Sequence, residues 1–368
     1  MGLFLKQKKS GTKFSKHTIL EEDLFIRRKE KMEPWGEFPR RVLSGEPIFE
    51  IDHCLVLSPV NGIARNTESG ISITQDGLLQ QRQLSEKKEF SYDEILDKVR
   101  AMSIISLDFP CQPLVGLFQK AKTEEFDIIF SPFSRTNNID FAAMIMNELK
   151  DEFMQFKGNL MTVFRGSPFK DFIGPANLKY QYPDGIPEFF IQKFTDTSVI
   201  PDKTLYLGAE TIYHMLRALY LNIPFYQRYI TVNFADKWGN VDIGNEAYLV
   251  FNGQSLNFIK NKIPAKYNYF TYNSFYESNE VFSRDDQFYI DIFRDYSITF
   301  FEKKYERSPV CLDCNYCNYL CPVGANPYLL VSRESGFKKE LCFDCGICSV
   351  HCPGGVNLRQ KIKDVKNG

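Results

Sequence analysis

Residues 311–322 read CLDCNYCNYLCP, and residues 342–353 read CFDCGICSVHCP. In each stretch two residues separate the first three cysteines from one another, three residues separate the third from the fourth, and a proline follows. Eight of the 10 cysteines of the chain therefore lie in its last sixth. A secreted disulfide protein spreads its cysteines over the fold that they staple, so this clustering indicates metal binding in a reducing compartment.

The spacing of both stretches is that of bacterial [4Fe–4S] ferredoxins. Three closely spaced thiolates can wrap one face of a cubane, and in two-cluster proteins the fourth thiolate reaches the other cluster. The sequence thus predicts two [4Fe–4S] clusters with interleaved ligands. Cluster 1 takes Cys311, Cys314, Cys317 and Cys352, and cluster 2 takes Cys342, Cys345, Cys348 and Cys321. The prolines turn the chain away after the fourth ligand of each stretch.

Zinc is the alternative for these cysteines. Zinc sites usually combine two closely spaced cysteine pairs separated by a longer loop, which two runs of four fit poorly. Cys54 and Cys111 stand alone in the sequence and are expected to be small buried hydrophobic residues. His351 precedes a predicted ligand, but the cysteine count is already complete, so we expect it beside the site and not in it.

The composition restricts the class of protein. With 368 residues, 43% hydrophobic and 25% charged, the chain matches a soluble protein of several domains. Its net charge of -1 gives no nucleic-acid signature. We find no apolar run long enough for a membrane helix and no secretory signal. The chain is therefore expected in the cytoplasm, with any membrane contact made through partner subunits or its basic N-terminal end.

Local patterns predict several elements upstream of the cysteines. Short apolar stretches between turn residues favour a small β-barrel or sandwich after residue 40, and strand–helix–strand alternation favours an α/β unit after residue 87. A third unit should pack a helix on a small mixed sheet. The expected helices are 93–101, 140–150 and the stretch LGAETIYHMLRALYLNIPF at 207–225; the expected strands are 126–130, 160–164 and 228–232; a connecting helix and an extended arm are expected within 263–307.

Three upstream stretches, followed by the double cysteine motif, resemble the C subunit of the Rnf electron-transport complex. They also resemble, without the cysteines, the A subunit of the sodium-pumping NADH:quinone reductase. The stretches are SGEPIFEIDHCLVLSPVNGIAR at 44–65, YQYPDGIPEFFIQK at 180–193 and LGAETIYHMLRALYLNIPFYQRYITV at 207–232.

The resemblance implies a multidomain α/β fold, α+β overall. Its parts would be a basic irregular segment at 1–40, a barrel-sandwich hybrid at 41–87, a Rossmann-like α/β domain at 88–203, a β-grasp domain of the soluble-ligand-binding type at 204–262, a connecting arm at 263–307, and a dicluster ferredoxin-like domain with a basic tail at 308–368.

One departure from the family concerns its nucleotide site. The family binds NADH and flavin at a glycine-rich loop, whereas the corresponding stretch here, SIISLDFPCQPLVGLFQ at 103–119, keeps only Gly116 and carries Pro110 and Pro113. Proline removes a backbone donor that a phosphate needs. The acidic motif that should follow is replaced by Ser134, Arg135 and Thr136. We therefore expect neither NADH nor FMN to bind tightly.

The resemblance implies an electron-transfer subunit of a membrane-associated, Rnf-like oxidoreductase complex. Its partners would be the other subunits and a ferredoxin or flavodoxin-like carrier, and it would lie on the inner face of the cell membrane. Two alternatives stay open: a flavin-dependent NADH dehydrogenase subunit of the same family, and a scaffold whose clusters only stabilise its fold. No arrangement of residues suits nucleophilic catalysis, so no catalytic residue is expected.

Overall fold

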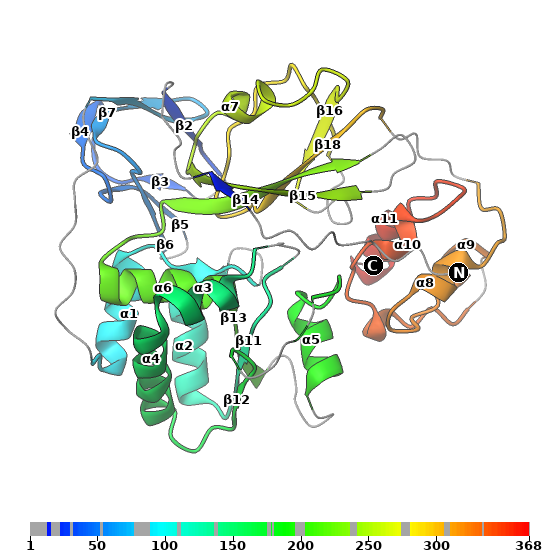
Figure 1. Ribbon diagram of the computed structural model, residues 1–368, viewed down its shortest axis with the longest axis horizontal. Helices are drawn as coiled ribbons and strands as arrows, with labels where there is room; N and C mark the ends of the chain where they lie inside the picture. The colour runs from blue at the N-terminus through cyan, green and yellow to red at the C-terminus, as the bar shows by residue number, and fades with distance from the viewer. Residues whose placement is uncertain are drawn as a thin grey trace.

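The computed structural model describes most of the chain, and its elements form a mixed α/β protein (Figure 1). The described residues are 13–15, 23–29, 32–51, 54–76, 89–108, 112–135, 139–174, 178, 180–195, 203–235, 241–273, 280–304, 310–332 and 335–367. In Figure 1 two β-sheet regions lie above a helix-rich unit, and the cysteine-rich module lies to one side.

The first unit is a pair of small sheets. One has the strand order β2-β8-β7-β4 and the other β3-β5-β6, all with antiparallel neighbours. Buried side chains of both sheets, among them Ile26, Phe49 and Ile73, share one core. The strands are β2 (Leu24–Arg27), β3 (Glu33–Pro34), β4 (Arg40–Val42), β5 (Pro47–Ile51), β6 (Cys54–Leu57), β7 (Gly62–Thr67) and β8 (Gly70–Gln75).

One prediction for this unit is confirmed and one needs correction. Of the two predicted alternatives, barrel and sandwich, the described residues form a sandwich and no closed barrel. The segment 1–40 was predicted to be irregular, yet β2 and β3 belong to the two sheets. These strands have only four and two residues, so alternation between buried and exposed positions is too brief to stand out among neighbouring charges.

The second unit contains a three-stranded parallel sheet of order β12-β11-β13. Its strands are β11 (Asp127–Ser131), β12 (Phe169–Asp171) and β13 (Thr204–Gly208). The helices are α1 (Tyr92–Ala101), α2 (Leu114–Thr123), α3 (Phe141–Glu148), α4 (Lys150–Val163), α5 (Pro187–Phe194) and α6 (Ala209–Leu221), and a short hairpin pairs β9 (Ile105–Ser106) with β10 (Gln112–Pro113). The predicted helices at 93–101 and 140–150 and the predicted strand at 126–130 are confirmed.

One further prediction in this unit is wrong. The stretch 160–164 was predicted as a strand, but α4 continues to Val163, because Phe153, Phe156 and Leu160 recur at helical spacing and bury one face. The helix predicted within 207–225 is confirmed as α6, except at its start, where Leu207 and Gly208 end the buried strand β13. An apolar run without periodicity does not distinguish a buried strand from a buried helix.

The third unit is a six-stranded mixed sheet of order β1-β15-β14-β18-β16-β17. It contains β1 (Lys13–Ser15), β14 (Gln227–Ala235), β15 (Val241–Phe251), β16 (Tyr269–Tyr272), β17 (Phe282–Ser283) and β18 (Ser297–Phe301), with α7 (Asn257–Lys260) after β15. The predicted strand at 228–232 lies within β14 and is confirmed. The segment 263–307, predicted as a helix and an arm, instead supplies β16, β17 and β18, and β18 pairs parallel with β14 in the middle of the sheet.

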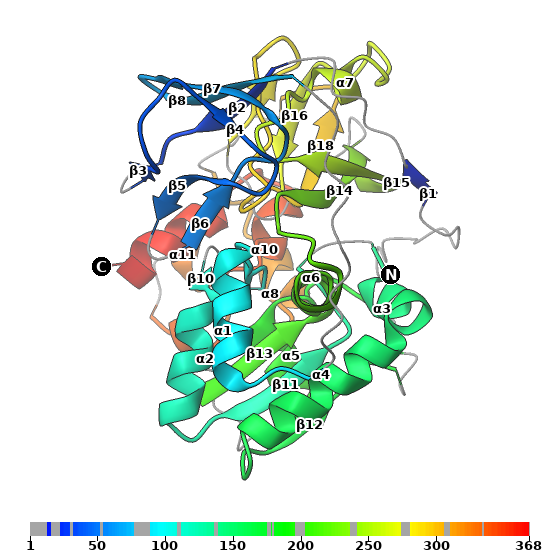
Figure 2. The same cartoon turned by 90° about the vertical axis from the view of Figure 1, so that its left-hand side faces the viewer.

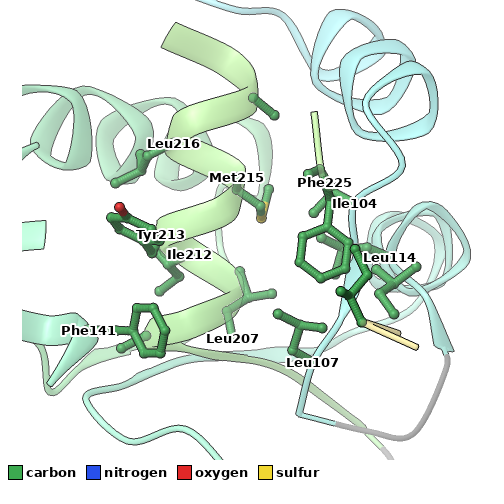
Figure 3. Packing of buried hydrophobic residues seen from close by; sticks show 14 of the residues in the cluster. Ile104, Leu107, Leu114, Phe141, Leu207, Ile212, Tyr213, Met215, Leu216 and Phe225 are labelled. Atoms are coloured by element: carbon green, nitrogen blue, oxygen red, sulfur yellow. The ribbon is translucent and has the colours of Figure 1, made fainter. Parts of the chain in front are cut away.

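Helix α6 lies between the second and third units and is buried around nearly its whole circumference (Figure 2). Figure 3 shows Met215, Leu216 and Ile212 of α6 packed among apolar side chains of the surrounding elements. Within this layer the Arg228 guanidinium of β14 binds both oxygens of Glu210 of α6, each at 2.8 Å. Both side chains are almost fully buried, so the ion pair ties α6 to the large sheet.

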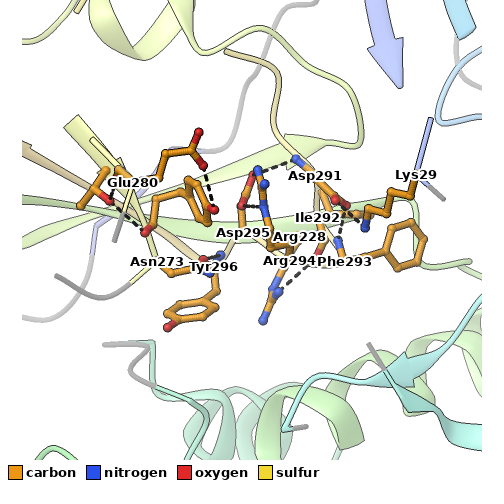
Figure 4. Close-up of polar contacts among 12 residues, drawn as sticks. Lys29, Arg228, Asn273, Glu280, Asp291, Ile292, Phe293, Arg294, Asp295 and Tyr296 are labelled. Carbon is orange, nitrogen blue, oxygen red and sulfur yellow. Dashed lines mark hydrogen bonds and ion pairs between the residues drawn. The ribbon is translucent and has the colours of Figure 1, made fainter. Parts of the chain in front are cut away.

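Polar contacts extend from this ion pair across the third unit. Arg228 also donates to the carbonyl of Ile292 at 3.1 Å, and Arg294 pairs with the buried Asp295 (Figure 4). Lys29, next to β2, pairs with Asp291 at 2.6 Å. The sandwich is thereby joined to the same loop that receives Arg228, which fixes the relative position of the first and third units.

The C-terminal module is small and has its own core. It contains α8 (Tyr316–Leu320), α9 (Leu329–Ser332), a 3-10 turn at Lys339–Leu341, α10 (Ile347–Val350) and α11 (Leu358–Asn367). Two cysteines, Cys317 and Cys348, are buried in this core with Val356, Leu358 and Ile362. Few large apolar side chains contribute, so the cysteines form a substantial part of the interior.

Candidate metal centres

The two cysteine stretches fold in the same way. After each first cysteine the backbone turns through left-handed conformations at matching positions, and it does so again after each Cys-Pro pair. The matching residues are Asp313 and Asp344 (φ 51° and 55°), Asn315 and Gly346 (54° and 77°), and Gly324 and Gly355 (62° and 69°). A short helix, α8 or α10, follows the second turn and carries the third cysteine. The repeat in sequence is therefore also a repeat in backbone conformation.

The first predicted ligand set lines one cavity. Cys311, Cys314 and Cys317 form part of its wall, and Cys352 of the second stretch completes the set. The cavity is partly open to solvent. The remaining wall is mainly apolar and is formed by Leu312, Tyr328, Val331, Pro353, Val356 and Leu358, with Asn315 and Gly354. This interleaving of the two stretches is the one that the spacing predicts.

The cysteines of the second predicted set lie near enough to one another to interact. Burial is the main cause that raises the pKa of Cys345 to about 12, and the nearby Cys342 and Cys321 act in the same direction. Burial likewise raises the pKa of Cys348 well above its ordinary value, with Cys345, Cys342 and Cys321 as further causes. Cys321 thus interacts with the cysteines of the second stretch. A bound cationic iron core would reverse this preference for neutral thiols, because metal ligation requires and stabilises thiolates.

Backbone N–H groups point at several of the sulfurs. The amide of Ala325 donates to Cys321 Sγ at 3.3 Å, and the amide of Val356 donates to Cys352 Sγ at 3.4 Å. These two donors occupy the same position after each Cys-Pro pair. The amide of Asp313 donates to Cys311 Sγ at 3.4 Å. Hydrogen bonds to ligand sulfurs stabilise their negative charge and help to set the potential of an iron–sulfur centre.

The donors around this cavity are cysteine thiols. In the described part of the chain, no three His, Cys, Asp or Glu side chains form a group that could hold one metal ion. A [4Fe–4S] cluster takes four thiolates, one at each iron, and the first predicted ligand set supplies four thiols around one cavity.

The α/β unit contacts the second cysteine loop. The Tyr182 hydroxyl donates to the Cys345 carbonyl at 2.6 Å, and the rings of Phe189 and Phe343 meet edge-on with centroids 6.1 Å apart. Phe189 belongs to α5, which lies between the parallel sheet and the module in Figure 1. Gly185 is required in the Tyr182 loop, because a Cβ there would lie 2.2 Å from the Ser134 carbonyl oxygen.

The first cysteine loop, in contrast, faces outward. Cys314 is exposed. Leu312 is 60% exposed, and Tyr319 of α8 is 73% exposed. The two candidate centres therefore differ in their surroundings, since one loop contacts the α/β unit and the other presents a ligand and apolar side chains at the surface.

The predicted loss of the nucleotide loop is tested only in part. Pro113 precedes the first turn of α2 and Gly116 lies within that helix, while Pro110, Cys111 and Thr136 lie outside the described residues. Ser134 is buried and Arg135 is partly buried. Cys54 is buried in the main core, as expected. His351 is partly buried and lies beside Cys352.

Sequence reasoning missed Asp108. Its Oδ2 accepts hydrogen bonds from the Gly208 amide at 2.9 Å and from the Thr211 hydroxyl at 2.8 Å, at the N-terminus of α6. A Cβ on Gly208 would lie 2.1 Å from Asp108 Oδ1. This helix begins at the carboxyl end of a parallel strand, where α/β proteins commonly bind phosphate groups. Here a carboxylate of the chain occupies that position.

Comparison with protein-family models gave no match, and comparison with curated proteins gave none either. Within the described residues, no helix has both the length and the apolar character needed to cross a bilayer.

Proposed function

We propose that this protein is an electron-transfer protein that carries two [4Fe–4S] clusters. Cluster 1 would bind Cys311, Cys314, Cys317 and Cys352, and cluster 2 would bind Cys342, Cys345, Cys348 and Cys321. The observation that carries the proposal is the presence of Cys352, from the second stretch, in the wall of the cavity formed by the first. When bound, such clusters accept and release single electrons.

The protein supplies the ligands, the insulation and the orientation. Buried apolar side chains, among them Val356 and Leu358, form part of the cavity wall. Amide donors to Cys311, Cys321 and Cys352 support their thiolates. No residue needs to act as a proton donor or nucleophile in this role.

The contacts of the two loops suggest an order for the relay. Because Tyr182 and Phe189 hold the second loop against the α/β unit, cluster 2 would exchange electrons on that side. Cluster 1, beside the exposed Cys314, would exchange electrons with an external protein. A ferredoxin or flavodoxin-like carrier has suitable chemistry for that role.

From the resemblance of the sequence we propose that this function belongs to an Rnf-like complex. The upstream units would then be the barrel-sandwich hybrid, the Rossmann-like domain and the β-grasp domain of that family, and the module would be the dicluster ferredoxin-like domain. Other subunits of the complex would hold the protein at the inner face of the cell membrane. Asp108 at the start of α6 supports an electron-transfer subunit that lacks its own NADH or FMN site, because it occupies a position suited to a phosphate.

The test is anaerobic purification followed by metal analysis and redox titration. We expect about eight irons per chain, from two cubanes, and reversible reduction. Cys352→Ser should deplete cluster 1 although it lies in the second stretch, and Cys54→Ser, in a buried position far from the module, should keep both clusters. Stoichiometric zinc without iron would exclude the proposal. Clusters that never accept electrons would favour the structural scaffold.

A further inference from the structure

The two halves of the repeat differ in one contact near the cysteines, which is an ion pair only in the second half. Tyr328 and Arg359 occupy matching positions, since the amide of Tyr328 donates to Asn318 Oδ1 and the amide of Arg359 donates to Ser349 Oγ, both at 2.9 Å. Asn318 and Ser349 are themselves matching residues of α8 and α10. The two side chains at these positions, one neutral and one cationic, reach back toward the first turn of their own cysteine stretch.

Both side chains meet an aspartate between the first two cysteines of their stretch. The Tyr328 hydroxyl lies 3.4 Å from Asp313 Oδ1. The Arg359 guanidinium binds Asp344 through both oxygens, with Nε–Oδ1 at 3.0 Å and Nη2–Oδ2 at 3.2 Å. The contact beside the first site therefore carries a net charge of about -1, and the contact beside the second site is neutral.

Two features strengthen this difference. The Arg359 side chain is only 9% exposed, so its charge is poorly screened by water. In addition, the Lys366 ammonium donates a hydrogen bond to the Cys342 carbonyl, within the second loop. The aspartate of the first loop, in contrast, is exposed to water.

We infer that Arg359 tunes the second cluster: by pairing with Asp344 it raises the reduction potential of that cluster and makes the two centres inequivalent. The inference rests on the proposed function. Reduction adds one electron, taken from a low-potential one-electron carrier, and breaks no bond. The added negative charge is stabilised by the nearby guanidinium and opposed by an unpaired carboxylate. Arg359 acts through the field at the ligands and does not contact the reacting atoms, so it is a positioning residue.

The experiment is a potentiometric titration of the anaerobic full-length protein, with dithionite as reductant, followed by electron paramagnetic resonance. Arg359→Gln should lower the electron affinity of one centre about tenfold, which is ~59 mV for a one-electron couple, and leave the other centre in place. The double variant Asp344→Asn with Arg359→Gln removes both charges and should return the midpoint toward that of the natural protein. Lys361→Gln removes an exposed cation of the same helix; it is the control and should shift neither midpoint.

Iron content separates the two ways in which this could fail. A natural protein without about eight irons overturns the proposed function, and the inference with it. Two clusters whose midpoints do not move in Arg359→Gln, or move together, overturn the inference alone. If Arg359→Gln loses its cluster, the variant Asp344→Asn tests the inference instead. This variant leaves Arg359 in place and removes the negative charge, so it should raise the electron affinity of one centre about tenfold, seen as a higher midpoint potential. An unchanged midpoint in Asp344→Asn would also contradict the inference.

Discussion

Replacement of Asp108 by Asn should change how the stability of the protein depends on pH. Burial raises the pKa of Asp108 from 3.8 to about 7, mainly because the charged form is desolvated, while the hydrogen bonds from Gly208 and Thr211 act in the opposite direction. The folded state therefore holds this proton more tightly than the unfolded chain does. The resulting stabilisation is complete below about pH 4 and is lost as the pH rises through about 7.

The size of the effect follows from that difference in pKa. At about 1.4 kcal/mol per unit of pKa difference, the raised pKa of Asp108 corresponds to about 4 kcal/mol of unfolding free energy, lost between about pH 4 and 7. His214 changes stability in the opposite direction, since burial lowers its pKa and favours its neutral form. Its stabilisation is present above about pH 6.5 and is lost at lower pH. A single pH profile would mix the two effects.

The difference between two profiles isolates Asp108. Urea unfolding of the natural protein and of Asp108→Asn, from pH 4 to 8.5, should give midpoints that diverge between about pH 4 and 7, with the variant increasingly more stable by comparison, and that stay a constant distance apart above about pH 7. Asn keeps an acceptor for the Gly208 amide and the Thr211 hydroxyl, so the fold should survive. Parallel profiles would refute the reasoning, because they would mean that Asp108 titrates alike in the folded and unfolded chains.

Other predictions concern the buried ion pair, the contact between units and the nucleotide site. Glu210→Gln should cost about 3–5 kcal/mol in urea unfolding, because it leaves the buried Arg228 charge without its partner; a loss below about 1 kcal/mol would contradict this. Tyr182→Phe removes the hydrogen bond to the Cys345 carbonyl and should weaken docking of the module by about 1 kcal/mol, seen as faster proteolysis between the units with unchanged iron content; an unchanged cleavage rate would argue against that role. Calorimetry should detect neither NADH nor FMN binding at micromolar concentration, and prompt bleaching of the clusters by NADH would refute the expectation.

The candidate ligands of the module could be proposed from sequence alone, because their positions depend on local spacing. Three cysteines within one turn and a short helix reach the same cavity whatever the rest of the chain does. The left-handed turns at Asp313 and Asp344 were not predicted, since aspartate adopts that conformation less readily than glycine. The contribution of Cys352 to the first cavity agrees with the prediction that spacing supports.

The errors fall where structure depends on distant partners. Strand β18 pairs with β14 from across some 60 residues, and nothing local in its aromatic-rich sequence identifies that partner. Asp108 contacts Gly208 across 100 residues, so its place at the start of α6 depends wholly on the tertiary fold. The continuation of α4 through 160–164 was missed because a short apolar stretch was considered without the turns that precede it.

The exchange of fourth cysteines between the two stretches also has a consequence for biosynthesis. Neither candidate site can gather four thiolates while the chain has been made only as far as Cys345, because Cys348 and Cys352 are still missing. The first site has only three of its proposed ligands, Cys311, Cys314 and Cys317, until Cys352 of the second stretch has been synthesised. Under the proposed ligand sets, completion of both centres then falls late in synthesis, and a chain that ends before Cys348 would complete neither, although it contains the whole first stretch.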